Sequence, residues 1–132
     1  MIKNIIKICS LGILALILTK CDNHEFPKTP YPNVRTSPVT NISASGATFT
    51  GEVSNSENSS IISHGFVWTV WKNNNPEIGP NDSVELGNLI GDDTFYYHLN
   101  KTLNGSQEYY VRAFVKTKDY IVFGEEVSFK SK

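Results

Sequence analysis

The chain has 132 residues, 39% of them hydrophobic, and a formal net charge of −1. This length suits a single domain with one hydrophobic core. Three of the 12 basic residues precede residue 21, so the remainder holds nine basic residues against 13 acidic ones, a balance of −4; this argues against nucleic-acid binding, which requires a basic surface patch.

The N-terminal segment has the order of features found in a bacterial lipoprotein signal peptide. Lys3 and Lys7 precede an apolar run over residues 8–18, and Cys21 follows that run, after which polar residues dominate. The run has 11 residues. A membrane-spanning helix needs roughly 20, whereas the core of a signal peptide needs only about 7–15. We therefore expect residues 1–20 to form a lipoprotein signal peptide.

Residues 18–21, Leu-Thr-Lys-Cys, resemble the lipobox recognised by the lipoprotein signal peptidase. Lys20 departs from that pattern, in which a small residue precedes the cysteine. The resemblance implies that Cys21 is lipidated and holds the protein on a membrane. An uncleaved or differently cleaved signal is the alternative. Because Cys9 lies within the signal peptide, the mature chain would retain one cysteine and could form no internal disulfide.

Residues 21–33 are expected to form a tether between the lipid and a folded domain. Pro27, Pro30 and Pro32 disfavour regular structure there, and apolar residues are sparse. The domain itself is expected to span residues 34–132.

Strand signals recur along that domain, with turn residues between them. Residues rich in β-branched and aromatic types, or alternating apolar with polar, occupy 47–53, 61–71, 95–99, 109–117 and 120–129. Turn-rich segments cover 55–60 and 72–83. No stretch of ten residues after the tether has helical periodicity. The pattern predicts an all-β fold, a single antiparallel β-sandwich of about seven strands.

The segment 103–113 resembles the junction between the fifth and sixth strands of fibronectin type III domains. Leu103 is followed six residues later by Tyr109, and then by Val111 and Ala113. The resemblance implies a tyrosine corner, in which the Tyr109 hydroxyl bonds to the backbone of the preceding loop. Gly105 and Gln107 replace residues usual in that loop.

A narrower resemblance covers most of the domain. Four segments resemble, in order, signatures of fibronectin-like domains in Bacteroidetes surface proteins: 47–53, 65–69 followed by Asn75 and Pro76, 109–114 and 123–129. The resemblance implies a fibronectin type III-like domain of a surface lipoprotein. It also implies placement on the outer membrane, facing outward, because Asp22 and Glu25 behind the cysteine resemble a surface-export signal.

Alternation along the strands predicts which side chains face the core. Trp68 is expected at its centre, and the predicted core comprises Phe49, Val53, Phe66, Trp68, Phe95, Leu99, Leu103, Val111, Val127 and Phe129. The same alternation places five residues on the outer face of one sheet: Val67, Trp71, Tyr110, Arg112 and Phe114. Aromatic residues and arginine are typical of binding hot spots, so these five form a candidate binding patch. The alternative is that Arg112 only stacks locally, between Tyr110 and Phe114 or on Trp71 across the strands.

Residues with the potential for chemistry are scattered. His24, His64 and His98 have no metal-ligand spacing. The acidic cluster Asp82, Glu85, Asp92 and Asp93 matches no calcium loop, and no catalytic motif is present. We expect neither enzyme activity nor a cofactor. The tripeptide at 82–84 resembles an O-glycosylation signal on Ser83.

The predicted function is therefore a non-catalytic envelope lipoprotein with a recognition or adhesion domain, whose partner is a protein or a glycan. Two alternatives remain: a spacer or assembly subunit of a larger envelope complex, and an accessory protein for glycan capture. Exposed aromatics favour glycan capture, because sugars stack on aromatic faces. A hydrophobic patch without polar partners favours protein docking.

Overall fold

The structure is a computed structural model that describes residues 31–72, 76–79 and 81–132. The expected signal peptide, Cys21 and the tether up to residue 30 lie outside the described residues, as does His24. Within the described ranges, no helix has the length and apolar character needed to cross a membrane.

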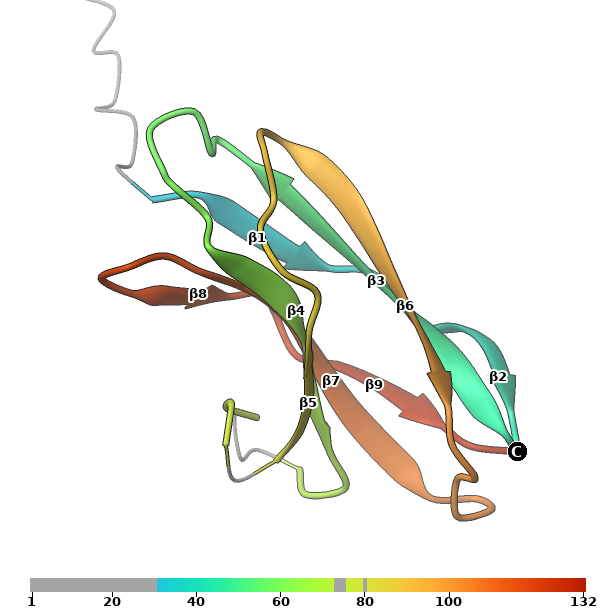
Figure 1. Ribbon diagram of the computed structural model, residues 1–132. Coiled ribbons are helices and arrows are strands. Elements are labelled where there is room, and N and C mark those ends of the chain that lie inside the picture. Colours follow the sequence, from blue (N-terminus) through green and yellow to red (C-terminus); the bar gives the residue numbers. More distant parts are fainter. Residues whose placement is uncertain (1–30, 73–75, 80) are drawn as a thin grey trace, which may run out of the picture.

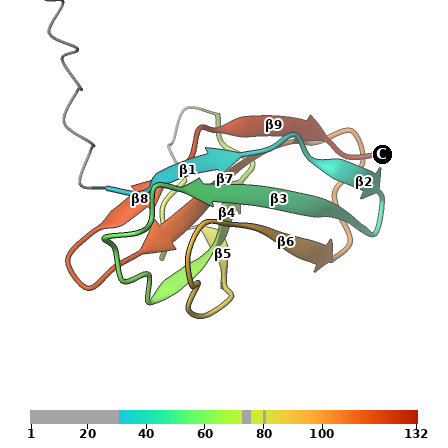
Figure 2. The same cartoon turned by 90° about the horizontal axis from the view of Figure 1, so that it is seen from above.

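The described residues form two antiparallel sheets that pack face to face (Figures 1 and 2). The strands are β1 (Asn33–Thr36), β2 (Thr40–Ser43), β3 (Gly46–Ser54), β4 (Ser63–Thr69), β5 (Asp82–Glu85), β6 (Asp93–Asn100), β7 (Glu108–Lys116), β8 (Ile121–Phe123) and β9 (Val127–Lys130). We call β1, β2, β3 and β6 the first sheet, and β4, β5, β7, β8 and β9 the second sheet. The predicted all-β sandwich is confirmed.

These nine segments occupy seven strand positions, because two positions are each split in two. β3 pairs with β1 along one half and with β2 along the other, and Pro38, which has no backbone N–H, stands between them. β7 pairs in the same way with β8 and β9. There, residues 124–126 face only Arg112 and Ala113, which makes a β-bulge. Thr36 Oγ1 accepts a hydrogen bond of 2.9 Å from the Ala113 N–H beside this bulge.

The core lies between the sheets and is dominated by aromatic rings. Phe49 is fully buried, and its ring centroid lies 5.6 Å from that of Phe66, 5.4 Å from Trp68 and 5.8 Å from Phe129. All ten predicted core residues belong to this core: Val127 is partly buried and the other nine are buried. For the nine of these residues that lie on strands, alternation located the interior correctly, whereas Leu103 lies between β6 and β7.

The tyrosine corner is present. The backbone N–H of Asn104 donates a 3.0 Å hydrogen bond to the hydroxyl of Tyr109, as expected from the sequence. The Tyr109 ring stacks on Phe129 at 5.3 Å. Ser131 adds a hydrogen bond from its hydroxyl to the Asn104 carbonyl, so the β6–β7 loop is held from both sides.

Two boundaries differ from the sequence prediction. The loop expected over 72–83 ends earlier, because β5 begins at Asp82 and pairs with the end of β4. Ser83 therefore lies exposed on a strand and not in a loop. At the other boundary, Asn33 already belongs to β1, and the Tyr31 ring meets Tyr120 edge-on at 4.9 Å, so contact with the domain begins before residue 33.

Candidate functional site

The candidate binding patch occupies the expected face but is mostly buried. Strand register places Val67 opposite Arg112 and Gly65 opposite Phe114, on the side of the second sheet that faces away from the core. Val67 and Phe114 are 0% exposed and Tyr110 is 6% exposed. The expectation of five exposed residues is therefore wrong for these three, and they cannot form a docking surface in this conformation.

The burial has an identifiable cause. The ring of Phe123 on β8 lies 6.0 Å from that of Phe114. The guanidinium of Arg112 lies 4.6 Å above the Phe123 ring, and its Nε donates a 2.8 Å hydrogen bond to the Gly124 carbonyl at the bulge. We call Val67, Tyr110, Arg112, Phe114 and Phe123 the outer cluster. Arg112 does stack on an aromatic ring, but that ring is Phe123 and not one of the three rings expected from the sequence.

The β4–β5 loop contributes to the same face. Pro76 in that loop is fully buried, and Figure 1 shows the described part of the loop on the side of β4 and β5 away from β3 and β6. Burial lowers the pKa of Arg112, while the charges of Glu126 and Glu77 oppose that shift. The influence of Glu77, which follows Pro76, indicates that this loop lies near Arg112. Burial also raises the pKa of Tyr110, and Glu108 and then Glu126 add to the effect.

Trp71 differs from the rest of the predicted patch because it is 66% exposed. β4 ends at Thr69, so strand alternation does not reach Trp71, and its position follows from a turn. The backbone N–H of Trp71 donates a 3.2 Å hydrogen bond to Thr69 Oγ1, and Thr69 itself is buried. The turn is thereby fixed to the end of the strand while the indole remains in solvent.

The two ends of the sandwich carry different features (Figure 1). The chain enters β1 at what we call the tether end, where Tyr31 packs against Tyr120. β4 runs from that end to the opposite one, the distal end, so that Trp71 lies far from the point of entry. The distal end also holds the β6–β7 loop with its tyrosine corner.

A hollow of about 240 Å³ lies at the distal end, and we call it the distal hollow. Its lining includes Trp68, Trp71, Asn81, Asp82 and Tyr109. β5 contributes Asp82 because its register places that residue opposite Trp68. The hollow thus combines aromatic surface with an amide and a carboxylate, a combination that the sequence alone did not bring together.

Hydrogen bonds and charge fix the polar side of the hollow. The Asp82 carboxylate pairs with Lys101 Nζ at 3.2 Å, and both side chains are solvent-exposed. Asn81 Nδ2 donates a 3.2 Å hydrogen bond to the Glu77 carbonyl. An exposed pair of this kind adds little stability, so a ligand could compete for the Asp82 oxygens at small cost.

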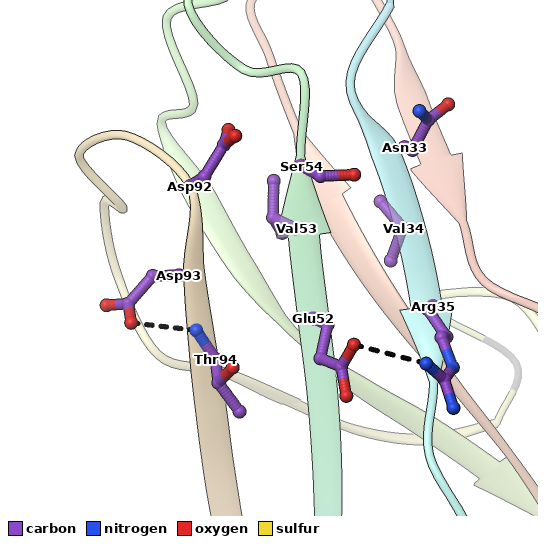
Figure 3. A pocket seen from close by; sticks show the side chains of 9 residues that line it. All are labelled: Asn33, Val34, Arg35, Glu52, Val53, Ser54, Asp92, Asp93 and Thr94. Carbon is purple, nitrogen blue, oxygen red and sulfur yellow. Dashed lines mark hydrogen bonds and ion pairs between the residues drawn. The ribbon is translucent and has the colours of Figure 1, made fainter.

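A larger hollow, of about 620 Å³, lies at the tether end (Figure 3). Arg35 and Glu52 form an exposed ion pair of 3.5 Å across its floor, and Asp93 accepts the Thr94 N–H at 2.7 Å. Asp92 on its rim accepts hydrogen bonds from the hydroxyl and backbone N–H of Ser56, which lower the pKa of Asp92. Its polar groups are largely engaged with one another and no aromatic residue lines it, so we regard it as the weaker candidate.

The described part of the chain contains no group of three potential metal ligands from His, Cys, Asp and Glu. The acidic cluster of the sequence is divided between the two sheets, with Asp82 and Glu85 on β5 and Asp93 on β6. His64 is buried, with Nδ1 2.7 Å from the Gly87 carbonyl. His98 Nδ1 lies 3.1 Å from Thr48 Oγ1. Both histidines therefore have structural hydrogen bonds.

No family model matches the chain, and no curated protein matches it. Two solved structures of the sensor domain of the anti-sigma factor RsgI4 from Pseudobacteroides cellulosolvens are similar to it. One has 20% identity and a TM-score of 0.50, covering 76% of this chain and 93% of that one. The other, a solution structure, has 18% identity and a TM-score of 0.49, covering 76% and 75%. At this level the first similarity shows a shared fold alone.

Proposed function

We propose that the protein is a lipid-anchored envelope protein with a fibronectin type III-like domain that serves recognition and not catalysis. The observation that carries the proposal is the separation of the two ends of the sandwich. The chain enters at the tether end, and the exposed Trp71 beside the distal hollow lies at the other. Such an arrangement suits a domain that presents its distal end outward from a membrane surface.

The sequence supplies the anchor for this arrangement. Cys21 follows a basic and then apolar segment, and 11 residues separate it from Asn33 at the start of β1. At full extension a segment of this length spans about 35–40 Å, which is enough to hold the domain clear of a lipid surface. The outer membrane, facing outward, is the location that the sequence resemblance favours.

The burial of the outer cluster also favours one kind of partner over another. Protein docking would use a broad apolar surface, but the side chains predicted to supply it, Val67, Tyr110 and Phe114, are buried. At the distal end, the exposed indole of Trp71 lines a hollow together with an amide and a carboxylate. This supports capture of a compact ligand at the distal end, in preference to the role of a spacer or assembly subunit.

Metabolic labelling with a fatty-acid probe tests the anchor. We expect the full-length protein to incorporate the probe and to fractionate with membranes, and the Cys21→Ala variant to lose both properties. Protease added to intact cells should cleave the wild-type domain if it faces outward. Labelling that persists in Cys21→Ala would contradict lipidation at this residue, and protection from protease would contradict surface display.

A further inference from the structure

We infer that the distal hollow binds carbohydrate, taking one neutral sugar residue of a larger glycan against the indole of Trp71. The inference rests on the proposed recognition function and names its ligand class. It draws on three features of the hollow: the exposure and fixed position of Trp71, the polar groups beside it, and its size and charge.

The position of Trp71 is that of a binding platform. A tryptophan that is 66% exposed leaves a large apolar face in water, and such residues are enriched among binding hot spots. Its backbone N–H donates a hydrogen bond of 3.2 Å to the buried Thr69, so less backbone freedom is lost when a ligand stacks on the ring. The C–H face of a pyranose ring is flat and apolar enough to cover an indole.

The polar groups complement the rest of a sugar. A pyranose carries hydroxyl groups around its rim, each of which donates and accepts hydrogen bonds. Asp82 and Asn81 line the same hollow as Trp71, and a carboxylate and an amide can engage adjacent hydroxyls. Apolar surface with a few placed polar groups is the usual composition of a specific small-ligand site.

The size and charge of the distal hollow further restrict the class of ligand that it can bind. The volume of about 240 Å³ lies below the range of about 300–1,000 Å³ that is typical of sites for drug-sized molecules, so the hollow accommodates one ring, and the rest of a chain would extend into solvent. The neighbouring cation, Lys101, is paired with Asp82. Asp82 is the only charged residue among the described residues that line the hollow, so an acidic sugar would meet a carboxylate there, which favours a neutral sugar.

Affinity electrophoresis tests the inference with the full-length protein purified in detergent. The probes are four neutral polysaccharides, soluble starch, mixed-linkage β-glucan, xylan and mannan, with polygalacturonate as the acidic contrast. We expect at least one neutral polysaccharide to retard the protein and polygalacturonate to leave it unretarded. Of the two tryptophans, Trp68 is buried and Trp71 exposed, so binding should also protect tryptophan fluorescence from quenching by acrylamide.

Matched variants identify the site. Trp71→Ala should weaken binding by about ten-fold or more, as expected for a hot-spot residue, and Asp82→Asn should weaken it to a lesser degree. Tyr96→Ala removes an aromatic of similar exposure, 57%, from β6 on the other sheet, and should bind like wild type. Equal loss in Tyr96→Ala, or full binding in Trp71→Ala, would overturn the assignment of the hollow.

The outcomes separate this inference from the anchor proposal. If none of the four neutral polysaccharides is bound, the carbohydrate inference is wrong, while probe labelling at Cys21 and cleavage on intact cells still decide the proposed function. Binding of a protein through Trp71 in place of any polysaccharide would likewise overturn the ligand class and leave recognition at the distal end intact. Retardation without labelling at Cys21 would contradict the anchor alone.

Discussion

The outer faces of the two sheets are built in opposite ways. On the first sheet, the outward side chains of β6 are exposed, among them Thr94, Tyr96 and His98. On the second sheet, Val67, Tyr110 and Phe114 point outward and are nevertheless buried. Alternation predicts to which side of a sheet a residue belongs, but it does not predict whether that side is covered.

The difference arises from what lies over each face. On the outer face of the first sheet, polar side chains pair across neighbouring strands. Examples are Thr48 with His98 at 3.1 Å and Arg35 with Glu52 at 3.5 Å. The second sheet has Phe123 and the loop that carries Pro76 over its outer face. It therefore supports a small second cluster outside the main core, of the kind that forms beneath long loops.

The largest expected effect comes from truncating that outer cluster. Phe114→Ala should lower the free energy of unfolding by roughly 3–5 kcal/mol, because it removes a fully buried ring and leaves a cavity. This equals the cost expected for Trp68→Ala in the main core. Urea denaturation of the two variants makes the comparison, and a cost below about 1 kcal/mol for Phe114→Ala would mean that the outer face is only loosely covered.

Substitution of Arg112 tests whether the stability of the outer cluster depends on its single charged member. Arg112→Met keeps most of the aliphatic contact with Phe123 but removes the hydrogen bond to the Gly124 carbonyl. Because the residue is only partly buried, we expect a loss of about 1–2 kcal/mol. Arg112→Lys is the control, since it keeps the charge but not the geometry of the Nε donor. Stability unchanged in Arg112→Met would show that apolar packing alone closes the bulge.

The variant Tyr109→Phe tests how much the tyrosine corner at the distal end contributes to stability, independently of either outer face. Tyr109→Phe removes the acceptor for the Asn104 N–H while keeping the ring stacked on Phe129. The expected cost is about 1 kcal/mol, the usual value for one hydrogen bond whose partner is left unsatisfied. Chemical denaturation measures it. A loss as large as that of Phe114→Ala would mean that the hydroxyl organises the whole β6–β7 loop.

Sequence reasoning identified what local periodicity and one family motif encode. The core around Phe49 and Trp68 and the corner at Tyr109 follow from alternation and from a tyrosine at a characteristic spacing. The cover of the second sheet does not, because it depends on the burial of Pro76 and the position of Glu77, which lie between β4 and β5, near Arg112. Phe123 carried no signal either, since its contact with Phe114 requires the β7–β8 register.

The distal hollow was missed for a similar reason. The strand-like sequence pattern extends to Trp71, although β4 ends at Thr69, and the turn-rich segment includes Asp82, although β5 begins there. Asp82 on β5 pairs with Trp68 on β4, and this pairing places the Asp82 carboxylate in the hollow that Trp71 also lines. Residues 84–86, Val-Glu-Leu, alternate apolar with polar, and this is a signal from which a short edge strand could have been predicted there.

The smallest expected effect comes from the polar face of the first sheet. Tyr96 on β6 lies opposite Thr50 on β3 and is 57% exposed. Tyr96→Ala should therefore change the free energy of unfolding by no more than about 0.5 kcal/mol. The residue is as large as the buried aromatics of the outer cluster, and the two sheets differ mainly in what covers them. The ratio between the losses in Phe114→Ala and Tyr96→Ala, measured in the same denaturant series, therefore reports the cover itself. If Tyr96→Ala costs 2 kcal/mol or more, the first sheet also packs its outer face, and Tyr96 would no longer serve as a neutral control for Trp71.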